Sequence, residues 1–363
     1  MKSDTTQCHR RLPAEWEESD AVMIAWPHVG TDWEPILDEV TRTYIDIARA
    51  VIKVATLVVI APDVSLPKRY LATYDSEERP IVYCQIPTND TWARDFGPIT
   101  VEESYGHGGD AAMVPLDFTF NGWGMKFAAD KDNLITSRMA EKALFASQPE
   151  GHREFVLEGG SIESDGRGTL MTTSECLLSP NRNPWMDKAQ IEEYLLRTFG
   201  ARHMLWVDHG YLAGDDTDSH IDTLARLAPD NTIIYVTPPD DEADEHYDAL
   251  KSMERQLMRL RTPEGEPYHL IGLPMADARY DEDGNRLPAT YANYLVVNGT
   301  ILMPSYGSPQ KDELAAKMLG IAYPGYNVVQ IDCTPLIRQH GSLHCVTMQL
   351  PKGTLSAGGV TAN

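Results

Sequence analysis

Hydrophobic residues recur along this chain with two spacings, one typical of amphipathic helices and one typical of buried strands. A compact apolar run at 21–26 ends at Pro27, which predicts a first core strand. From 35 to 55 the apolar positions are spaced three and four apart, which predicts an amphipathic helix. The β-branched run 56–61 ends at Pro62 and predicts a second strand.

The succession of a helix and a short buried strand returns four more times. Further helices are expected at 133–145, 187–199, 241–261 and 309–319. Each leads into an apolar run, at 154–157, 203–207, 268–273 and 328–333 respectively. Turn residues predict hairpins at Asp165-Gly166, Pro229-Asp230-Asn231 and Asn298-Gly299. With the first helix this makes five units, and because no linker or composition shift separates them we predict one α/β domain spanning 1–363.

The segment 214–227 (G-D-D-T-D-S-H-I-D-T-L-A-R-L) concentrates charged residues directly before apolar ones. If it is a strand, alternate side chains share a face, and the residues on that face are Asp216, Asp218, His220 and Asp222. Three interpretations fit such an acidic face with one histidine. It is a solvated acidic turn, a site for a hard divalent cation, or a group of carboxylates and a histidine that handles a cationic substrate.

The net charge narrows the range of partners. The 363 residues include 54 Asp and Glu against 31 Lys and Arg, which gives a formal charge of −23. We therefore expect neither nucleic acid nor an anionic membrane surface as a partner. A cationic ligand fits this charge better, although an excess of acidic residues also serves solubility alone. The 42% of hydrophobic residues is enough for a large buried core.

Cysteine usage and the N-terminal sequence indicate a reducing compartment. The five cysteines are widely spaced and form no C-x-x-C pair, so neither a disulfide framework nor a zinc site is expected. The N-terminal residues lack the apolar segment of a signal peptide, and no apolar run approaches the ~20 residues that cross a bilayer. We expect a cytoplasmic protein with reduced thiols, whose oligomeric state, a homo-oligomer included, stays open.

Two further segments place polar groups at the ends of apolar runs. Residues 88–100 (T-N-D-T-W-A-R-D-F-G-P-I-T) form a loop before a strand, a common position for ligand groups. A surface ion-pair cluster of Asp90, Arg94 and Asp95 is the simpler alternative. Glu158 follows an apolar run and precedes two glycines, which allow close approach of another segment. A carboxylate there is costly without a partner, so we expect a histidine or guanidinium beside it, or a backbone turn that it caps.

Cys345 lies in an apolar stretch, G-S-L-H-C-V-T-M at 341–348, which predicts a strand. A cysteine in a strand is usually an inert small hydrophobic residue, and its thiolate becomes a nucleophile only in an electropositive or histidine-bearing setting. On a strand, His344 points to the opposite face. The histidine that serves Cys345 should therefore come from elsewhere, and His220 is the best candidate.

Six short motifs are spread along the chain. They are R-L-P-A-E-W-E at 11–17, N-D-T-W-A-R-D-F-G-P at 89–98, D-F-T-F-N-G-W-G at 117–124, L-E-G-G-S at 157–161, S-H-I-D at 219–222 and L-H-C at 343–345. In this order they resemble the agmatine deiminase and bacterial peptidyl-arginine deiminase family, within the wider group of guanidine-modifying enzymes. Each motif is weak alone, whereas six in the right order are highly specific.

The resemblance implies an α/β fold of the pentein type, a five-bladed pseudo-symmetric α/β propeller with a central active-site channel. It also implies that Cys345 is the nucleophile and that His220 is the general acid and base. Glu158 is then the acid that orients the histidine. Asp95 and Asp222 are the carboxylates that hold the guanidinium.

Trp92, Trp123 and Asp216 match positions near the substrate in agmatine deiminases. The chain departs from the typical agmatine deiminase in the nucleophile loop, where Gln339-His340-Gly341-Ser342 replaces a glycine-rich run, and this leaves the substrate open. A guanidinium is planar and always charged, so two carboxylates can hold it in front of a sulfur atom. Attack, loss of ammonia and hydrolysis of a covalent thiouronium then need only the thiol and the histidine. We therefore expect no metal and no organic cofactor.

The expected reaction is the conversion of agmatine to N-carbamoylputrescine and ammonia. Agmatine ends in an ammonium, which suits Asp215, Asp216 and Asp218, whereas an arginine substrate needs a basic partner for its carboxylate. Arg94 and Arg226 could supply that partner, but arginines near several carboxylates usually pair with them. Peptidyl or free arginine is the alternative substrate. Two further hypotheses are an amidinotransferase and a non-catalytic binder of guanidines or polyamines.

Overall fold

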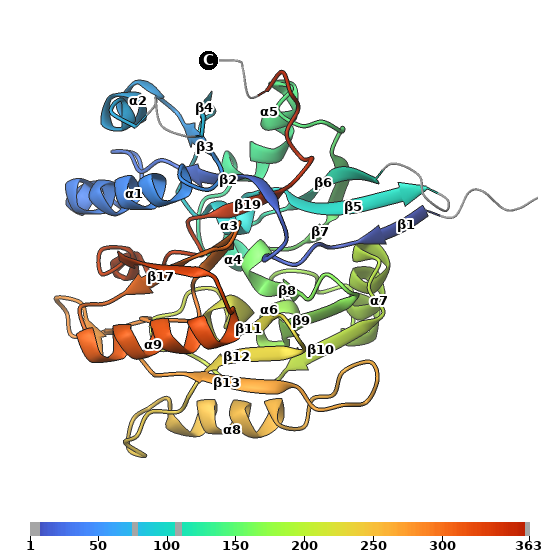
Figure 1. Cartoon of the computed structure of the whole chain (residues 1–363), viewed down its shortest axis with the longest axis vertical. Coiled ribbons are helices and arrows are strands. Elements are labelled where there is room, and N and C mark those ends of the chain that lie inside the picture. The colour runs from blue at the N-terminus through green and yellow to red at the C-terminus, as the bar shows by residue number, and fades with distance from the viewer. Residues whose placement is uncertain (1–7, 75–78, 106–110, 360–363) are drawn as a thin grey trace, which may run out of the picture.

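The computed structural model describes residues 8–74, 79–105 and 111–359, and every structural statement below concerns these residues. The fold is mixed α/β. In Figure 1 the long helices lie on the outside and the strands nearer the middle; these helices are α1 (Leu37–Val51), α7 (Lys188–Phe199), α8 (Tyr247–Leu257) and α9 (Pro309–Ala322). No helix in these ranges is long and apolar enough to span a membrane. The four cysteines whose side chains are described are free and buried.

Three sheets share one strand arrangement. In each, a hairpin joins the first two strands antiparallel, and a helix carries the chain to a third strand that pairs in parallel with the second. Their strands are β8 (Ile162–Ser164), β9 (Thr169–Thr173) and β10 (His203–Val207) with α7; β11 (Ala225–Ala228), β12 (Thr232–Val236) and β13 (His269–Leu273) with α8; and β16 (Leu295–Val297), β17 (Thr300–Ser305) and β18 (Asn327–Asp332) with α9.

In two further sheets the first two strands again pair antiparallel and the third pairs in parallel with the second, and a fourth strand lies at an edge. One contains β5 (Ile99–Tyr105), β6 (Ala111–Thr119) and β7 (Glu150–Val156) with α5 (Ile135–Glu141), and β1 (Cys8–Arg11) at its edge. The other contains β19 (Met348–Pro351), β2 (Ser19–Ala25) and β3 (Thr56–Ala61) with α1, and β4 (Ile81–Gln85) at its edge. In this second sheet the antiparallel pair comes from opposite ends of the chain and not from a hairpin. One hydrophobic cluster includes residues from all five sheets, so they share a core.

Each helix and strand predicted from hydrophobic spacing is present, with some ends shifted, and all three predicted hairpin turns occur. The runs 56–61 and 203–207 match β3 and β10 residue for residue. Helix α8 begins at Tyr247 rather than at 241. The carboxylates of Asp241 and Asp244 each accept a backbone hydrogen bond from two residues ahead, which favours turns over a helix.

The strand predicted over 214–227 is wrong. The segment instead runs through turns into the short helix η4 (Ile221–Thr223), and only β11 at its end is a strand. Asp218 and Ser219 have φ angles of 63° and 60°, in the left-handed region that strands exclude. The cause is Asp215, whose carboxylate accepts hydrogen bonds from backbone N–H groups two and four residues ahead, at 3.3 and 2.7 Å. The charged residues of this segment therefore do not share one face of a strand.

The strand predicted around Cys345 is also wrong, because this cysteine lies in a turn directly before β19. The Thr347 hydroxyl donates to the backbone oxygens of Leu343 and His344, at 3.0 and 3.1 Å. The Asn293 side chain accepts hydrogen bonds from two successive backbone N–H groups of the turn, at 2.9 and 3.3 Å. These side-chain hydrogen bonds satisfy the backbone in place of a strand ladder.

Candidate active site

Three short helical turns bring the expected catalytic residues together, and Figure 1 places one of them, α3 (Ala93–Phe96), near the middle of the fold. Asp95 lies in α3, Glu158 directly precedes η3 (Gly159–Ser161), and His220 directly precedes η4, which contains Asp222. α3 contacts η3, and η3 contacts η4. All four side chains are buried. The alternative of a solvated acidic turn or a surface ion-pair cluster is therefore wrong for these residues.

Gly160 marks the point on which three of these groups converge. A methyl group built on Gly160 lies 2.7 Å from His220 Nδ1, 2.8 Å from Asp95 Oδ1 and 3.1 Å from Asp222 Oδ2. Only glycine leaves this space open, which confirms the close approach expected from the L-E-G-G-S motif. The backbone N–H of Gly160 donates to Asp95 Oδ1 at 3.1 Å and so fixes that carboxylate.

Asn293 connects the cysteine to this group. The Cys345 thiol lies 3.3 Å from Asn293 Oδ1, and Asn293 Nδ2 donates to Asp222 Oδ2 at 3.3 Å. Among the described residues, buried Asp222 Oδ1 and both ring nitrogens of His220 have no hydrogen-bond partner. One carboxylate oxygen and the imidazole are thus available to a bound molecule.

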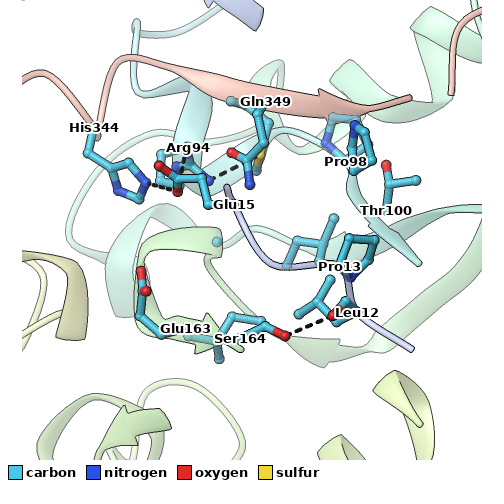
Figure 2. Close-up of a pocket in the computed structure, with 15 residues that line it drawn as sticks. Leu12, Pro13, Glu15, Arg94, Pro98, Thr100, Glu163, Ser164, His344 and Gln349 are labelled. Carbon is cyan, nitrogen blue, oxygen red and sulfur yellow. Dashed lines mark hydrogen bonds and ion pairs between the residues drawn. The ribbon is translucent and has the colours of Figure 1, made fainter. Parts of the chain in front are cut away.

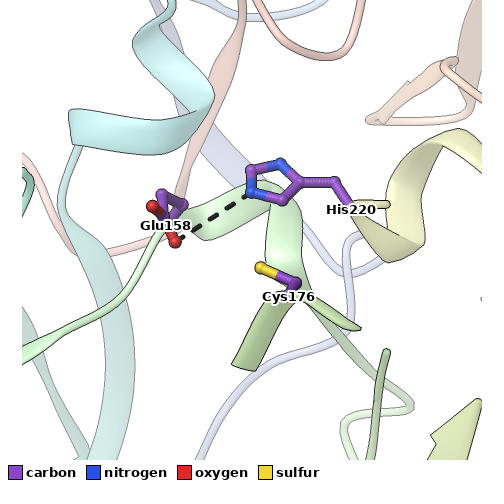
Figure 3. A group of neighbouring side chains, drawn as sticks. All are labelled: Glu158, Cys176 and His220. Atoms are coloured by element: carbon purple, nitrogen blue, oxygen red, sulfur yellow. Dashed lines mark ion pairs between the residues drawn. The ribbon is translucent and has the colours of Figure 1, made fainter. Parts of the chain in front are cut away.

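Glu158 and Cys176 lie behind the imidazole of His220 (Figure 3). His220 Nε2 is 4.0 Å from Glu158 Oε2, whereas Nδ1 on the other edge of the ring is 3.6 Å from Asp95 Oδ1. Arg182 Nε donates to both oxygens of Glu158, at 3.0 and 2.9 Å. The predicted partner of Glu158 is therefore confirmed as both a histidine and a guanidinium, and Glu158 caps no backbone turn.

The same cluster has the donor types of a zinc site. Ligating atoms of Glu158, Cys176 and His220 lie within 4.8 Å of one another, and all three residues are buried. Cysteine, histidine and glutamate are the ligands that Zn²⁺ prefers. However, the guanidinium of Arg182 already occupies both Glu158 oxygens, and this buried cation opposes a second cation at the same place. The cluster therefore supports a histidine held by a carboxylate better than a metal site.

Burial and neighbouring charges shift the pKa values of His220, Asp95 and Cys345. Burial alone lowers the pKa of His220, but Asp95, Cys176 and Glu158 outweigh it and raise the pKa to about 10, so the imidazole is protonated at neutral pH. Burial raises the pKa of Asp95 to about 6, although His220 works against this. Burial, and then Asp222 and Asp95, raise the pKa of the Cys345 thiol well above its ordinary value.

A pocket of about 160 Å³ opens beside Cys345 and Asp95. It is lined by the remaining predicted residues, Trp92, Trp123 and Asp216. The rest of its lining consists of Asp32, Asp90, Phe127, Thr217, Gln339, His340 and Gly341. Trp123 Nε1 donates to Asp95 Oδ2 at 2.9 Å, so this indole also orients a carboxylate. None of the described lining residues is lysine or arginine.

A second cavity of about 60 Å³ is lined by chain neighbours of the site residues (Figure 2). Arg94 and His344 line it, whereas Asp95 and Cys345 line the pocket. The expectation that His344 faces away from Cys345 is thus confirmed, although the segment is a turn.

Charged groups at the second cavity pair with one another. Arg226 donates to Glu163 Oε1 at 2.5 Å and to Glu15 Oε2 at 2.9 Å. Arg94 Nη2 lies 3.7 Å from Glu15 Oε2 (Figure 2). The expectation that Arg94 and Arg226 pair with neighbouring acids is confirmed. Both arginines are therefore engaged within the protein rather than exposed to the pocket.

The sequence analysis did not identify Asn293 and Arg182 as residues of the site. It named His344 but did not predict its contact with Asp222. Nδ1 of His344 lies 2.7 Å from Asp222 Oδ2, and its Nε2 lies 2.7 Å from Glu15 Oε2. Asn293 stands before the apolar run that contains β16, whereas Glu158 was marked by its place after an apolar run. Arg182 stands in N-R-N-P, which two residues separate from the apolar run C-L-L, and this position gave only a weak signal.

Comparisons with known proteins agree over nearly the whole chain. Residues 11–351 match the family model described as Porphyromonas-type peptidyl-arginine deiminase. A solved structure from Porphyromonas gingivalis, named as a candidate arginine deiminase, is 45% identical, covers 96% of this chain and 100% of its own, and has a TM-score of 0.86. A substrate-bound structure of the C. jejuni agmatine deiminase, carrying a cysteine-to-serine substitution, is 35% identical, covers 96% and 98%, and has a TM-score of 0.86. A Legionella pneumophila (strain Paris) relative, named as a candidate agmatine deiminase, is 32% identical over 94% of this chain and 95% of its own.

Proposed function

Because the chain belongs to the Porphyromonas-type peptidyl-arginine deiminase family, we propose that it hydrolyses a guanidine to a urea and ammonia, with agmatine as the substrate. The observation that carries the proposal is the convergence of a thiol, a protonated histidine and two carboxylates beside a pocket lined by acids and aromatic rings. The C. jejuni agmatine deiminase, 35% identical with a TM-score of 0.86, supports the same reaction class.

Asp95 and Asp222 hold the guanidinium in this proposal. A guanidinium is a planar fork of donors, and two carboxylates on either side fix its carbon atom in one place. Asp222 Oδ1 has no hydrogen-bond partner among the described residues and is free to accept such bonds. Burial by itself raises the pKa of Asp222, but the hydrogen bond from His344 and the charges around it lower the pKa overall. This carboxylate is therefore ionised before the substrate arrives.

The Cys345 sulfur attacks the guanidinium carbon and forms a C–S bond. The neighbouring carboxylates oppose the thiolate in the empty pocket, and a cationic substrate between them neutralises that field, so substrate binding favours ionisation of the thiol. His220 then gives its proton to the departing nitrogen and the C–N bond breaks. Ammonia departs, and a covalent thiouronium remains on the sulfur. Next, His220 takes a proton from water as the water oxygen attacks the carbon. The C–S bond then breaks, the remaining hydroxyl proton passes to the sulfur, and the ureido product and the Cys345 thiol are released. This path uses no metal or organic cofactor.

The pocket lining supports agmatine over arginine. Asp32, Asp90 and Asp216 offer carboxylates to the distal ammonium of agmatine, and Trp92 and Trp123 offer apolar surface to its methylene chain. An arginine carboxylate has no lysine or arginine to meet among the described residues of this lining. The alternative, a peptidyl or free arginine substrate, is favoured by the name of the family and by the P. gingivalis structure named as an arginine deiminase.

We infer further that the five repeated sheets are the blades of a five-bladed α/β propeller around a central channel, and that residues 1–363 form one domain. The recurring order of hairpin, helix and parallel strand supports this inference. A propeller explains why the site draws residues from segments as distant as 95, 158, 220, 293 and 345, because each unit then contributes one connection to the centre. A cytoplasmic location is part of the proposal, whereas the oligomeric state stays open.

The decisive experiment measures kcat/KM for agmatine, free arginine and a peptide ending in arginine, with ammonia and ureido product quantified together. We expect agmatine to be preferred by at least ~100-fold, on the scale of leaving a buried charge without its partner. Addition of EDTA should leave the rate unchanged. A preference for the peptide refutes the agmatine assignment. Transfer of the amidino group to an added amine without ureido product identifies an amidinotransferase, and binding without turnover identifies a non-catalytic binder.

A further inference from the structure

Arg182 is a fully buried cation that joins the loops carrying Glu158 and His220. Its side chain is 0% exposed. Nε donates to both oxygens of Glu158, Nη1 donates to Asp218 Oδ2 at 2.6 Å, and Nη2 donates to the backbone oxygen of Thr217 at 2.9 Å. One guanidinium therefore holds the carboxylate behind the histidine and the backbone just before it.

The loop that Arg182 holds is strained. Asp218 and Ser219 both have positive φ angles, 63° and 60°, a conformation that non-glycine residues adopt only when their surroundings enforce it. Thr217 Oγ1 accepts a hydrogen bond from the backbone N–H of His220 at 3.0 Å. The position of His220 thus depends on two strained residues, and Arg182 holds one of them, Asp218, together with the backbone of Thr217 beside it.

Arg182 is itself fixed from both sides. Asn183 exchanges two hydrogen bonds with the backbone of Val156, each 2.9 Å long, and so ties the segment to the strand that ends before Glu158. The backbone oxygen of Asn181 accepts a hydrogen bond from Asn121 Nδ2 at 2.8 Å. Lys126 occupies the second oxygen of Asp218 at 2.6 Å. The N-R-N sequence at 181–183 therefore joins the Glu158 loop, the His220 loop and the loop that carries Trp123.

We propose that Arg182 is a positioning residue for the deimination, which keeps Glu158 directed at His220 Nε2 and keeps the His220 loop in its strained conformation. The proposal rests on the function proposed above. His220 has to deliver one proton and then accept another, so an error in its position affects both halves of the reaction. The hydrogen bonds of Arg182 go to Glu158, Asp218 and Thr217. Its role is therefore to place the acid and base rather than to bind the substrate.

The test compares Arg182→Met and Arg182→Lys with the wild type, using agmatine turnover across pH. We expect kcat to fall about 100-fold in Arg182→Met with KM changed less than about threefold, the scale of a misplaced catalytic group. Arg182→Lys keeps the charge but not the fork of donors, and we expect a loss of about tenfold. Burial raises the pKa of Asp218, but the hydrogen bonds from Lys126 and Arg182 lower it overall. In Arg182→Met the acidic limb of the kcat profile should therefore move to higher pH, because Asp218 takes up a proton more readily and releases the loop before His220.

Alkylation of Cys345 by 2-chloroacetamidine provides a readout that needs no proton from His220. We expect this amidinium to bind between the same two carboxylates, Asp95 and Asp222, where the thiolate displaces its chloride. We expect its rate to change less than about threefold in both variants, because Arg182 lies behind the histidine and not in the pocket. Arg10→Met is the matched control, since Arg10 also holds two carboxylates, Glu103 and Glu150, and donates to the backbone oxygen of Thr198, none of which belongs to the Glu158 loop or the His220 loop. It should lower thermal stability and leave kcat and the pH profile unchanged.

An Arg182→Met protein with wild-type kcat and pH profile, corrected for the folded fraction, overturns the proposal. Equal losses of turnover and of alkylation also overturn it, because they indicate a collapsed pocket rather than a misplaced histidine. If Arg182→Met does not fold, Arg182→Lys decides by the same two readouts. A wild-type protein that is alkylated but releases no ammonia from any guanidine refutes the proposed function, whereas an active wild type with equally active variants refutes only the role of Arg182.

Discussion

The pocket and the second cavity are lined by consecutive residues of the same segments but differ in their charges, since the pocket is acidic and the second cavity contains both acids and cations. Asp95 and Cys345 line the pocket, while their neighbours Arg94 and His344 line the second cavity (Figure 2). In the pocket, the lining acids meet no described lysine or arginine of the lining. In the second cavity, Glu15 accepts from Arg226 and His344.

The difference in charge pairing between the two cavities indicates where the chain can bind a cation. Glu15 and Glu163 already accept hydrogen bonds from the guanidinium of Arg226 and have little left to offer a ligand, so the second cavity is a structural support. Carboxylates without such partners keep a field that a cationic ligand can neutralise. Neighbouring residues therefore differ in their expected roles: Arg94 and His344 line the supporting cavity, whereas Asp95 and Cys345 line the pocket of the proposed chemistry. Substitutions in the pocket and in the second cavity test this separation of roles.

Cys345→Ala should have the largest effect, the loss of all measurable turnover. The proposed C–S bond cannot form without the sulfur, and no other group in the pocket replaces it. A change from Cys to Ala removes little volume, so thermal stability should fall only modestly. Ammonia release and a melting curve check both statements. Retention of more than a few percent of wild-type turnover contradicts the nucleophile assignment.

Asp95→Asn and Asp222→Asn should rank next. Each change replaces a charged acceptor by an amide that presents donors to the guanidinium. We expect a loss of ~2–4 kcal/mol in transition-state stabilisation, or roughly 30- to 1000-fold in kcat/KM, the scale of losing a charged hydrogen bond at a reacting group. Steady-state kinetics with agmatine provides the measurement. A higher KM with unchanged kcat would mean that the carboxylate binds the substrate without positioning the reacting carbon.

The pH dependence of kcat/KM should have an alkaline optimum. The raised pKa of Cys345 means that the thiolate is lost as pH falls, and His220, whose pKa is raised to about 10, is already protonated and cannot take that proton. The rate should therefore rise up to about tenfold per pH unit above pH 6 and decline above about pH 10, where His220 loses its proton. Below about pH 6 protonation of Asp95 should steepen the fall. A profile that is flat down to pH 5 would contradict these assignments.

Sequence alone predicted most helices and strands and several residues that line the pocket, but not the supports behind them. Hydrophobic spacing located β3 and β10 because burial depends on local pattern. The strand interpretation of 214–227 was wrong because the Asp215 carboxylate accepts hydrogen bonds from nearby backbone N–H groups. The apolar pattern carries no information about such local hydrogen bonds. Glu158 was found from its position after an apolar run, whereas its partner Arg182 lies 24 residues further on. Such pairs depend on three-dimensional proximity.

His344→Gln should have a smaller effect that reaches the pocket only through Asp222. His344 bridges Asp222 and Glu15 with two contacts of 2.7 Å, and glutamine can supply only part of that bridge. Asn293 still donates to Asp222, so the carboxylate is loosened rather than released. We expect a loss of about tenfold in kcat/KM, the scale of one hydrogen bond to a charged group. An effect as large as that of Asp222→Asn would place His344 in the chemistry itself and break the separation of the two cavities.

Arg94→Met should have the smallest effect on catalysis and the sharpest bearing on the substrate. Arg94 lines the second cavity, its Nε and Nη2 have no hydrogen-bond partner among the described residues, and Glu15 lies 3.7 Å away. Burial is the largest influence on its pKa and lowers it, so the charge is held at a cost. Replacement of a poorly satisfied buried charge by an apolar side chain of similar length is often neutral or stabilising.

We therefore expect Arg94→Met to change kcat/KM for agmatine by less than about threefold and to leave the preference for agmatine over arginine unaltered. The matched variant Arg94→Lys keeps a charge in the same cavity and should behave alike in kinetics, so that only thermal stability separates the two. The measurement is kcat/KM for agmatine, arginine and a C-terminal arginine peptide with all three proteins. Arg94 can anchor a substrate carboxylate only if its guanidinium reaches the pocket that Asp95 lines. A loss confined to the two arginine substrates, rescued by Arg94→Lys, would show that it does, and would transfer Arg94 from the supporting cavity to the substrate pocket.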